Sequence, residues 1–189
     1  MKVGRIATLA DPVVNAAIDA ALLAAGFEVV TIEPAEIEDI GKAFVTIYFA
    51  GAWDADHHLL DTRPQGLGAE VTEILGLGPM FTPLAASARA DADRLTVSFC
   101  RLFEQFEVLA MPTLPILPPR LDDPLVGSAE LSMQMAGFTP LANVTGLPAL
   151  ALPVPVAGGP LPASLQLIGP HGSEDLLVAT GAVVEQAIA

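Results

Sequence analysis

The chain has 189 residues and carries 22 acidic against 8 basic side chains, which gives a formal net charge of −14. Nucleic acid attracts clustered Lys and Arg, and anionic membrane surfaces repel negative charge, so this composition excludes both as expected partners. A chain of this length can bury roughly 70% of its unfolded surface in one domain, and its 52% apolar residues indicate either a very full core or a surface covered by a partner.

Residues near the N-terminus predict a strand, a helix and a second strand. Residues 2–9 form a short apolar run that is typical of a strand. Asp11 can cap a helix, Pro12 suits its first turn, and Gly26 is well placed to end it. Residues 27–32 again have the composition of a strand, so the three elements indicate a βαβ unit with a parallel pair and a right-handed crossover. The apolar positions at helical spacing are Val14, Ile18, Ala21, Leu22 and Ala25.

The middle of the chain is predicted to be mainly helical. A helix over residues 34–60 is followed by a shorter one over 69–75. A break is expected at 76–79, where Gly, Leu, Gly and Pro follow one another. A long helix then covers 81–104. Its expected core positions are Leu84, Ala88, Leu95, Phe99 and Phe103.

The stretch from Leu131 to Ser173 contains no Asp, Glu, Lys or Arg. Seven prolines divide it into pieces that are too short to span a bilayer as a helix. Buried strands have the same composition, because both of their faces are covered. We expect two buried strands, over residues 149–152 and 164–168, with a loop or hairpin at 158–160.

Shorter elements complete the predicted fold. Residues 107–111 should form a strand, 113–134 mostly loop, and 138–144 a short helix or turn. Ser173 can cap the last helix. The expected apolar stripe of that helix is Leu176, Ala179, Val183 and Ala187. The fold class is therefore α/β, with a mixed, largely parallel sheet flanked by helices in a single domain over residues 1–189.

Cys100 is the single cysteine, so it cannot form an internal disulfide and fits a reducing compartment. The apolar residues that follow Arg5 stop at Asp11, which is too soon for the apolar region of a secretory signal peptide. We therefore expect a cytoplasmic protein.

Three segments, in this order, resemble the C-terminal part of amidase-signature enzymes. Residues 103–115 are similar to a helix that leads into a strand ending in Pro-Thr-x-Pro. Residues 138–149 match the pattern F-T-x-x-x-N-x-x-G-L-P-A. Residues 161–170 resemble L-P-x-G-x-Q-L-I-G, with Ser164 where the pattern usually has glycine. The resemblance covers nearly all of this chain but only about the last two-fifths of a full-length family member.

The resemblance implies an amide hydrolase that uses a serine nucleophile, a second serine in a cis peptide and a lysine base. The family places both serines in Gly/Ser-rich segments upstream of the part seen here. The two lysines are Lys2 and Lys42, and neither matches the family's lysine segment. None of the serines lies in a Gly/Ser-rich loop; they are Ser87, Ser98, Ser128, Ser132, Ser164 and Ser173. We therefore assign no catalytic residue and no cofactor.

Loops that follow strands carry the site in such folds, so the loop after Pro112 and the segment 138–143 should line the substrate cleft. The predicted substrate-binding residues are Thr113, Leu114, Phe138 and Asn143. The branch of the family that uses glutamine carries an acid two residues before the Phe-Thr step, to hold the substrate's amino group. Ala136 stands there in this chain, which disfavours glutamine as substrate.

The functional hypothesis is a C-terminal amidase portion that is inactive alone and completes its core and substrate cleft with a catalytic segment. An alternative is a non-catalytic remnant that binds a small molecule or a protein, including a second copy of itself. A third hypothesis is a metal hydrolase, because Asp54 and His58, and likewise His57 and Asp61, would share helix faces. A solvated, acidic helix end explains that cluster better, so no metal ligand is assigned.

Overall fold

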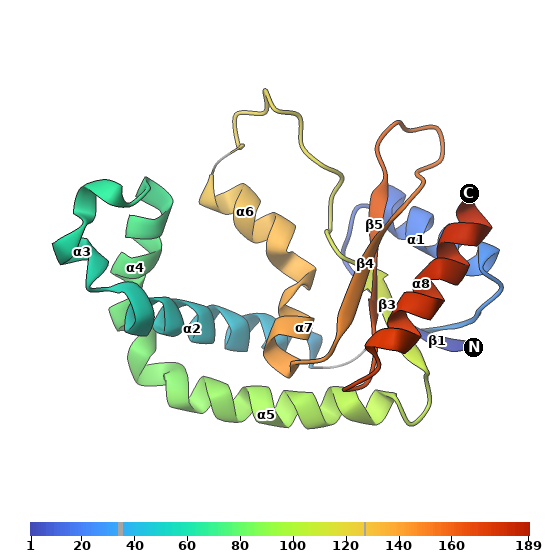
Figure 1. The fold of residues 1–189 in the computed structure, drawn as a ribbon, viewed down its shortest axis with the longest axis horizontal. Helices are drawn as coiled ribbons and strands as arrows, with labels where there is room; N and C mark the ends of the chain where they lie inside the picture. Colours follow the sequence, from blue (N-terminus) through green and yellow to red (C-terminus); the bar gives the residue numbers. More distant parts are fainter. Residues whose placement is uncertain (34–35, 127) are drawn as a thin grey trace.

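The computed structural model describes residues 1–33, 36–126 and 128–189, and its centre is a five-stranded sheet in the order β2-β1-β3-β5-β4 (Figure 1). The strands are β1 (Lys2–Ile6), β2 (Glu28–Ile32), β3 (Val108–Pro112), β4 (Ala149–Val154) and β5 (Ala163–Ile168). β1 runs parallel to both β2 and β3, whereas β5 is antiparallel to its neighbours β3 and β4. Four of these strands therefore share one direction and β5 is reversed, which confirms the mixed, helix-flanked α/β fold.

One face of the sheet is covered by α1 (Pro12–Ala24) and α8 (Glu174–Ile188). α1 begins as predicted, because the Asp11 carboxylate accepts a hydrogen bond of 2.8 Å from the Val13 amide. Gly26 follows the helix at a φ of +72° and lets the chain turn into β2. The parallel pairing of β1 with β2 confirms the predicted βαβ unit. The core on this face includes Val3, Ile18, Leu165, Leu167 and Val184.

The opposite face is covered by α2 (Ile37–Asp56), α5 (Ala85–Leu102) and α7 (Pro140–Thr145). The core here includes Ile6, Phe99, Leu109, Met111 and Ile168. β3 contributes alternate residues to the two cores and is buried along its whole length. A central strand covered on both faces explains why residues 108–112 carry no polar side chain.

An arm of helices extends to one side of the sheet, where α2 packs against α4 (Figure 1). Its other elements are α3 (Leu59–Thr62), η1 (Pro64–Gly66), α4 (Ala69–Phe81) and η2 (Thr82–Leu84). The predicted break at residues 76–79 is wrong, because α4 continues to Phe81. Leu84 was also predicted wrongly as a core residue and is 52% exposed, since η2 separates α4 from α5. The predicted start of α2 at Pro34 lies outside the described residues.

The chain after β3 contains α6 (Ala129–Met135) and η3 (Ala136–Phe138) before α7. The prediction of mostly loop over residues 113–134 is wrong only for its last residues, which belong to α6: the Ser128 hydroxyl accepts a hydrogen bond from the Leu131 amide and caps this helix. The predicted strand pair β4–β5 is confirmed, and Gly158 and Gly159 lie in its connecting loop. Among the described residues, no helix is both long and apolar enough to cross a bilayer.

Two details of the C-terminal region differ from the prediction. β4 is an edge strand with one open face, so its Ala149, Ala151 and Pro153 are exposed rather than buried. In α8 the buried positions are Leu177, Thr180, Gly181 and Val184. This stripe is displaced by one residue from the predicted one, leaving Ala179, Val183 and Ala187 exposed. The Ser173 hydroxyl does not cap α8; it donates a hydrogen bond to the Pro170 carbonyl.

Candidate functional site

The chain leaves β3 through a loop that stays attached to β5. The Thr113 amide donates a 2.8 Å hydrogen bond to the Ser164 carbonyl, and the Ser164 hydroxyl donates one of 2.9 Å to the Thr113 hydroxyl oxygen. Pro112 pairs with Leu165, so strand alternation places Thr113 and Ser164 on the sheet face that α7 covers further along. This hydroxyl pair holds the start of the predicted cleft loop against β5.

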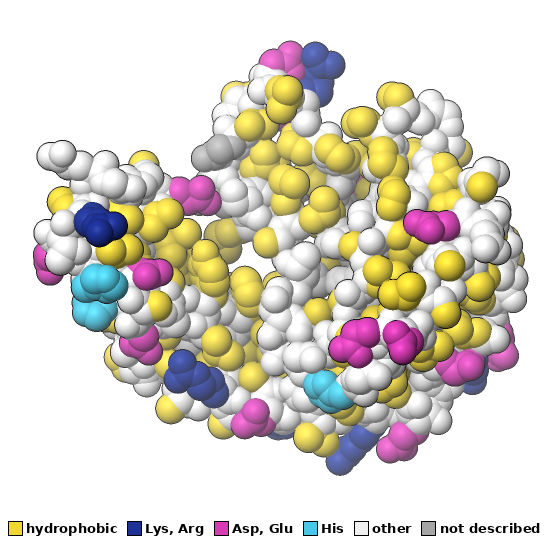
Figure 2. Space-filling view, in the orientation of Figure 1, with side chains coloured by type: hydrophobic (Ala, Val, Ile, Leu, Met, Phe, Trp, Pro, Cys, Tyr) yellow, Lys and Arg dark blue, Asp and Glu magenta, His cyan; other side chains and the backbone are white. Residues whose placement is uncertain are grey.

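Beyond Thr113, the loop borders a cavity of about 230 Å³ on the open side of β4 and β5. The lining residues are Leu114, Ile116, Pro118, Ala151, Leu152, Pro153, Pro162, Ala163 and Ser164. None of these side chains is ionisable, and Ser164 carries the one hydroxyl among them. Figure 2 shows hydrophobic side chains gathered on the hollowed side of the molecule between α2, α6 and the β4–β5 pair. Such a surface suits an uncharged group.

The second predicted segment lies beside this loop. A Cβ placed on Gly137 would lie 3.9 Å from Pro115 Cγ, which brings η3 next to the chain after β3. Phe138 is half-buried and packs against both hydrophobic cores. Asn143 on α7 is exposed, and its amide donates a 3.0 Å hydrogen bond to the Thr139 carbonyl one turn earlier. α7 then ends at Gly146, whose φ of +65° is one that other residues adopt reluctantly.

The structure thus brings Thr113, Leu114 and Phe138 to the region after β3, whereas Asn143 bonds within its own helix. Two polar residues of this region were absent from the predicted site, Ser164 and Gln166. They occupy alternate positions of β5 and so share a face. A period-two polar pattern within a strand that lacks charged residues was the available signal.

Neither lysine has the surroundings of a catalytic base. Lys42 Nζ lies 2.8 Å from the Asp39 carboxylate, and the Lys42 side chain is 73% exposed, so it points into solvent. The hydrogen bond and the charge of Asp39 raise the pKa of Lys42, whereas a lysine base needs a lowered one. Lys2 Nζ lies 5.3 Å from the centroid of the Phe106 ring. Among the described residues, no hydrogen bond joins a lysine amine to a serine hydroxyl.

The other candidate groups also have ordinary surroundings. His57 stacks on Trp53 at 4.8 Å between ring centroids, and its Nδ1 lies 2.7 Å from the Trp53 carbonyl oxygen. Over the ranges that the structure describes, no group of three or more His, Cys, Asp or Glu side chains could hold a metal ion. Cys100 is half-buried and His171 is exposed. Arg120 bonds the exposed Asp122 carboxylate and so lowers the pKa of that group.

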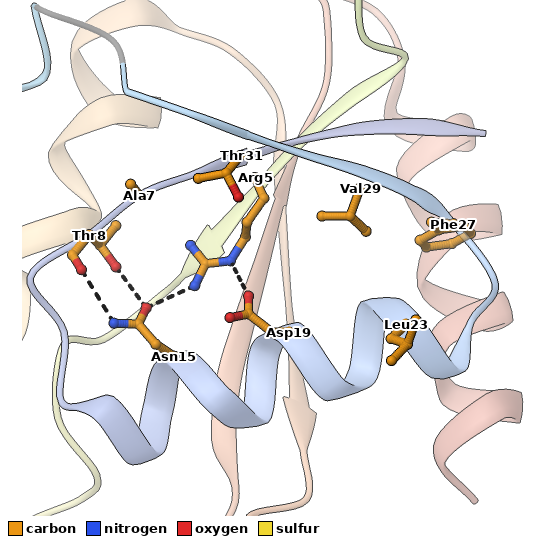
Figure 3. Close-up of a pocket in the computed structure, with 9 residues that line it drawn as sticks. All are labelled: Arg5, Ala7, Thr8, Asn15, Asp19, Leu23, Phe27, Val29 and Thr31. Carbon is orange, nitrogen blue, oxygen red and sulfur yellow. Dashed lines mark hydrogen bonds and ion pairs between the residues drawn. The ribbon is translucent and has the colours of Figure 1, made fainter.

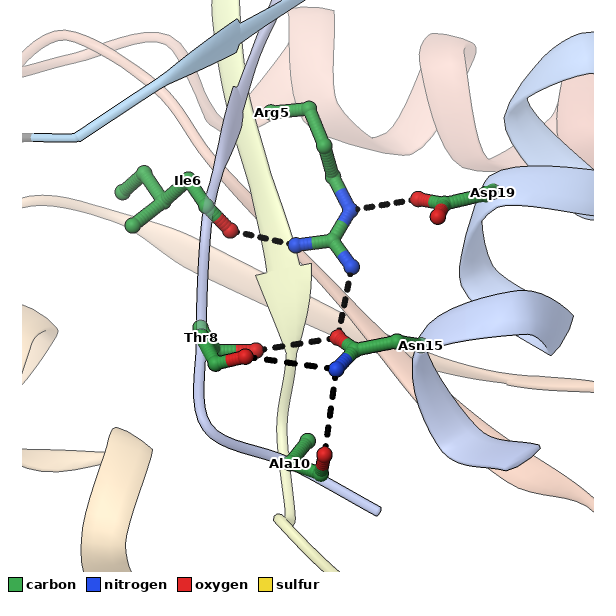
Figure 4. Close-up of polar contacts among 6 residues, drawn as sticks. All are labelled: Arg5, Ile6, Thr8, Ala10, Asn15 and Asp19. Carbon is green, nitrogen blue, oxygen red and sulfur yellow. Dashed lines mark hydrogen bonds and ion pairs between the residues drawn. The ribbon is translucent and has the colours of Figure 1, made fainter. Parts of the chain in front are cut away.

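A cavity of about 560 Å³ lies at the edge of the sheet opposite to β4, between α1 and the edge strand β2 (Figure 3). Its polar side is built by Arg5, whose Nε donates to Asp19 at 2.8 Å and whose guanidinium also donates to Asn15 Oδ1 at 2.8 Å. Asn15 in turn bonds Thr8 and the Ala10 carbonyl (Figure 4). The buried guanidinium of Arg5 therefore bonds side chains of α1 and links this helix to β1.

The family model described as Amidase matches residues 2–178 of this sequence. The chain belongs to the amidase family. The matched residues include the whole sheet, the loop after β3 and the first turn of α8. This assignment confirms the resemblance found in the three sequence segments.

Individual members of the amidase family match this chain over only part of their length. One subunit of the glutamyl-tRNA(Gln) amidotransferase of Halobacterium salinarum is 34% identical over 147 residues, which cover 73% of this chain and 33% of that relative. Allophanate hydrolase from Kluyveromyces lactis superposes with a TM-score of 0.84 at 19% identity, over 100% of this chain and 32% of that structure. A vestigial protein complex related to an s-triazine catabolic enzyme superposes with a TM-score of 0.80 at 21% identity, over 97% of this chain and 42% of that one. The amidase-family chain thus spans about a third of the curated relative.

Proposed function

We propose that this chain is the C-terminal portion of an amidase-type hydrolase. In this proposal it is inactive alone and forms the core and substrate cleft together with a catalytic segment that lies outside these 189 residues. The proposal depends mainly on how much of each protein is matched. The family model matches residues 2–178 of this chain, whereas the alignment covers only 33% of the amidotransferase relative.

The chemistry of amide hydrolysis supports the same conclusion. A serine hydroxyl is a weak nucleophile until a positioned base removes its proton. Among the described residues, the lysine amines contact Asp39 or a phenyl ring. The serine hydroxyls that donate hydrogen bonds there donate them to backbone carbonyls, to Thr113 or to Glu36. Activation of a nucleophile therefore requires groups from outside these residues.

The open face of β4 supports association with such a segment. Ala149, Ala151 and Pro153 are exposed within a stretch of sequence that lacks Asp, Glu, Lys and Arg from Leu131 to Ser173. Apolar edge strands are usually covered or charged in proteins that act alone. A catalytic segment that covers this face would explain the composition.

An uncharged amide is the substrate class that we propose for the assembled enzyme. Ala136 begins η3 and is half-buried, and its methyl group offers no charge to an ammonium group. The lining of the cavity beside Leu114 contains no ionisable side chain either. Both features disfavour glutamine, which carries an ammonium and a carboxylate.

Reconstitution tests the proposed function. The pure chain should not hydrolyse benzamide, whereas mixing it with a polypeptide that carries the lysine and Gly/Ser-rich segments of the amidase family should give a stable complex that does. Turnover by the pure chain that is lost on Ser164→Ala and kept on Ser132→Ala would contradict the proposal. A chain that stays monomeric with every such polypeptide would instead favour the non-catalytic remnant.

A further inference from the structure

Gln166 is the polar residue of β5 whose surroundings call for an explanation. The residue is only 3% exposed, and it pairs with Met111 on β3 and with Ala151 on β4. Its side chain lies on the face of the sheet that carries the exposed Ala151, because residues paired across strands point the same way. The carboxamide makes no hydrogen bond to another described residue.

A carboxamide buried without a partner is costly, and native structures rarely contain one. Among the described residues, however, no side-chain nitrogen or oxygen is both fully enclosed and without a partner. The amide end of Gln166 must therefore keep access to the open side of the sheet. Gln166 is not itself part of the cavity lining, but its strand neighbour Ala151 and its own-strand neighbour Ser164 are.

A second polar group lies beside it. Ser164 is two residues away on the same face, and its hydroxyl donates its proton to the Thr113 oxygen at 2.9 Å. Because Thr113 accepts there, its own hydroxyl proton is available to a further acceptor. Gln166 and Thr113 can thus offer both hydrogen-bond donors and an acceptor without offering a charge.

The neighbouring cavity has room for the apolar part of a small amide. It measures about 230 Å³, and its lining includes Leu114, Ala151 and Pro153. An engineered apolar cavity of about 150 Å³ is known to hold benzene, so a phenyl-sized group fits. The lining contains no ionisable side chain that would neutralise a charged ligand.

We propose that Gln166 is a specificity-determining residue that pairs its carboxamide with that of an uncharged amide substrate, while the substrate's apolar group occupies the cavity beside Leu114. This inference rests on the proposed function, since it assigns a role to Gln166 within the same cleft. A carboxamide presents one acceptor and two donors, so two carboxamides can exchange a pair of hydrogen bonds. A carboxylate has only hydrogen-bond acceptors, and an amidinium group has only donors, so neither can exchange such a pair with Gln166.

The experiment is a titration of the pure chain with benzamide, followed through the side-chain amide signals of its glutamines by NMR. We expect a saturable shift at Gln166 and weaker binding of benzoate and benzamidine, which have the same size but carry a charge. Gln166→Met keeps the volume of the side chain and should weaken benzamide binding by roughly tenfold, the value of about one hydrogen bond. Gln134→Met, at an exposed position of α6, should leave it unchanged.

Three outcomes would overturn the inference: no saturable binding of benzamide, equal binding by the folded Gln166→Met variant, or equal binding of benzoate. Thermal unfolding of each variant shows whether it is folded, and the comparison of the three ligands needs no variant. The titration uses the chain without any partner. The same variants are compared in the reconstituted complex, where the cleft is complete. Benzamide turnover with an unchanged KM in the Gln166→Met complex would remove the role of Gln166 and leave the proposed function standing.

Discussion

Arg5 places a guanidinium group between β1 and α1 with only 5% of the residue exposed. Its nitrogens donate to Asp19, to Asn15 and to the Ile6 carbonyl. Arg5→Met would keep much of the side-chain volume but leave these acceptors without their donor, so we expect the free energy of unfolding to fall by about 2–4 kcal/mol. Urea unfolding of the pure chain measures the change.

Asp19→Asn is the matched control for Arg5. The side chain of Asp19 is 59% exposed, and an asparagine oxygen can still accept the hydrogen bond from Arg5. The loss should therefore be smaller than that at Arg5, because asparagine keeps the hydrogen bond and only the counter-charge of the 6% exposed guanidinium is removed. A loss at Asp19 as large as that at Arg5 would show that the ion pair, and not the buried hydrogen bonds, joins the strand to the helix.

Single-residue predictions from local signals succeeded at Asp11 and Gly26 and failed at Ser173, whose hydroxyl bonds the Pro170 carbonyl and does not cap α8. Asp11 and Gly26 mark the ends of α1 through bonds and dihedral angles of the adjacent backbone. The alternation of polar residues in β5 could indicate the face on which Gln166 lies, but not its neighbours, because these depend on the register of β5 against β3 and β4. The pairing with β3 joins residues about fifty positions apart, and a single sequence does not record it.

Among the helices, α4 shows how packing can override a local break signal. A Cβ on Gly78 would lie 2.3 Å from Trp53 Cβ, so the missing side chain is what lets α4 approach α2. Gly78→Ala should therefore separate the two helices and lower the free energy of unfolding by about 1–3 kcal/mol. Gly76→Ala is the control, because nothing lies within 4 Å of its Cβ position. It should stabilise α4 by up to about 1 kcal/mol, and equal losses in both variants would contradict the packing argument.

The apolar stripe of α8 provides a second matched pair. Val184 is fully buried in the core shared with α1, whereas Val183 is 45% exposed. Val184→Ala should lower the free energy of unfolding by about 2 kcal/mol through lost burial, and Val183→Ala should change it by less than about 0.5 kcal/mol. Thermal unfolding of both variants measures the two losses. If the predicted stripe through Val183 faced the core instead, Val183→Ala would cause the larger loss.

The error in α8 has a physical cause. Both stripes repeat at helical spacing, and the helix contains apolar residues on adjacent positions, such as Val183 and Val184. Periodicity then fixes the presence of the helix but not its rotation, which is set by contacts with β4 and α1. Periodicity likewise predicted most of the helices and strands, whereas α6 and the exposed face of β4 were not predicted.

For the molecule as a whole, the open face of β4 is the feature on which the proposed association depends. Ala151 is exposed in the chain alone, so a lysine there can extend into solvent and should change the free energy of unfolding by less than about 0.5 kcal/mol. If a catalytic segment covers this face, the same lysine would have to be desolvated without a partner. Ala151→Lys should then weaken association by at least about thirtyfold, or roughly 2 kcal/mol.

Ala179→Lys provides the comparison for this last prediction, because Ala179 is exposed on α8, which covers the opposite face of the sheet. Its association with the catalytic polypeptide should match that of the unsubstituted chain. Calorimetric titration of the two lysine variants measures the difference, and urea unfolding confirms that both remain folded. Equal affinities would mean that the catalytic segment does not cover β4. The exposed alanines of that strand would then need another explanation, such as contact between two copies of this chain, which sedimentation of the unsubstituted and Ala151→Lys proteins would detect.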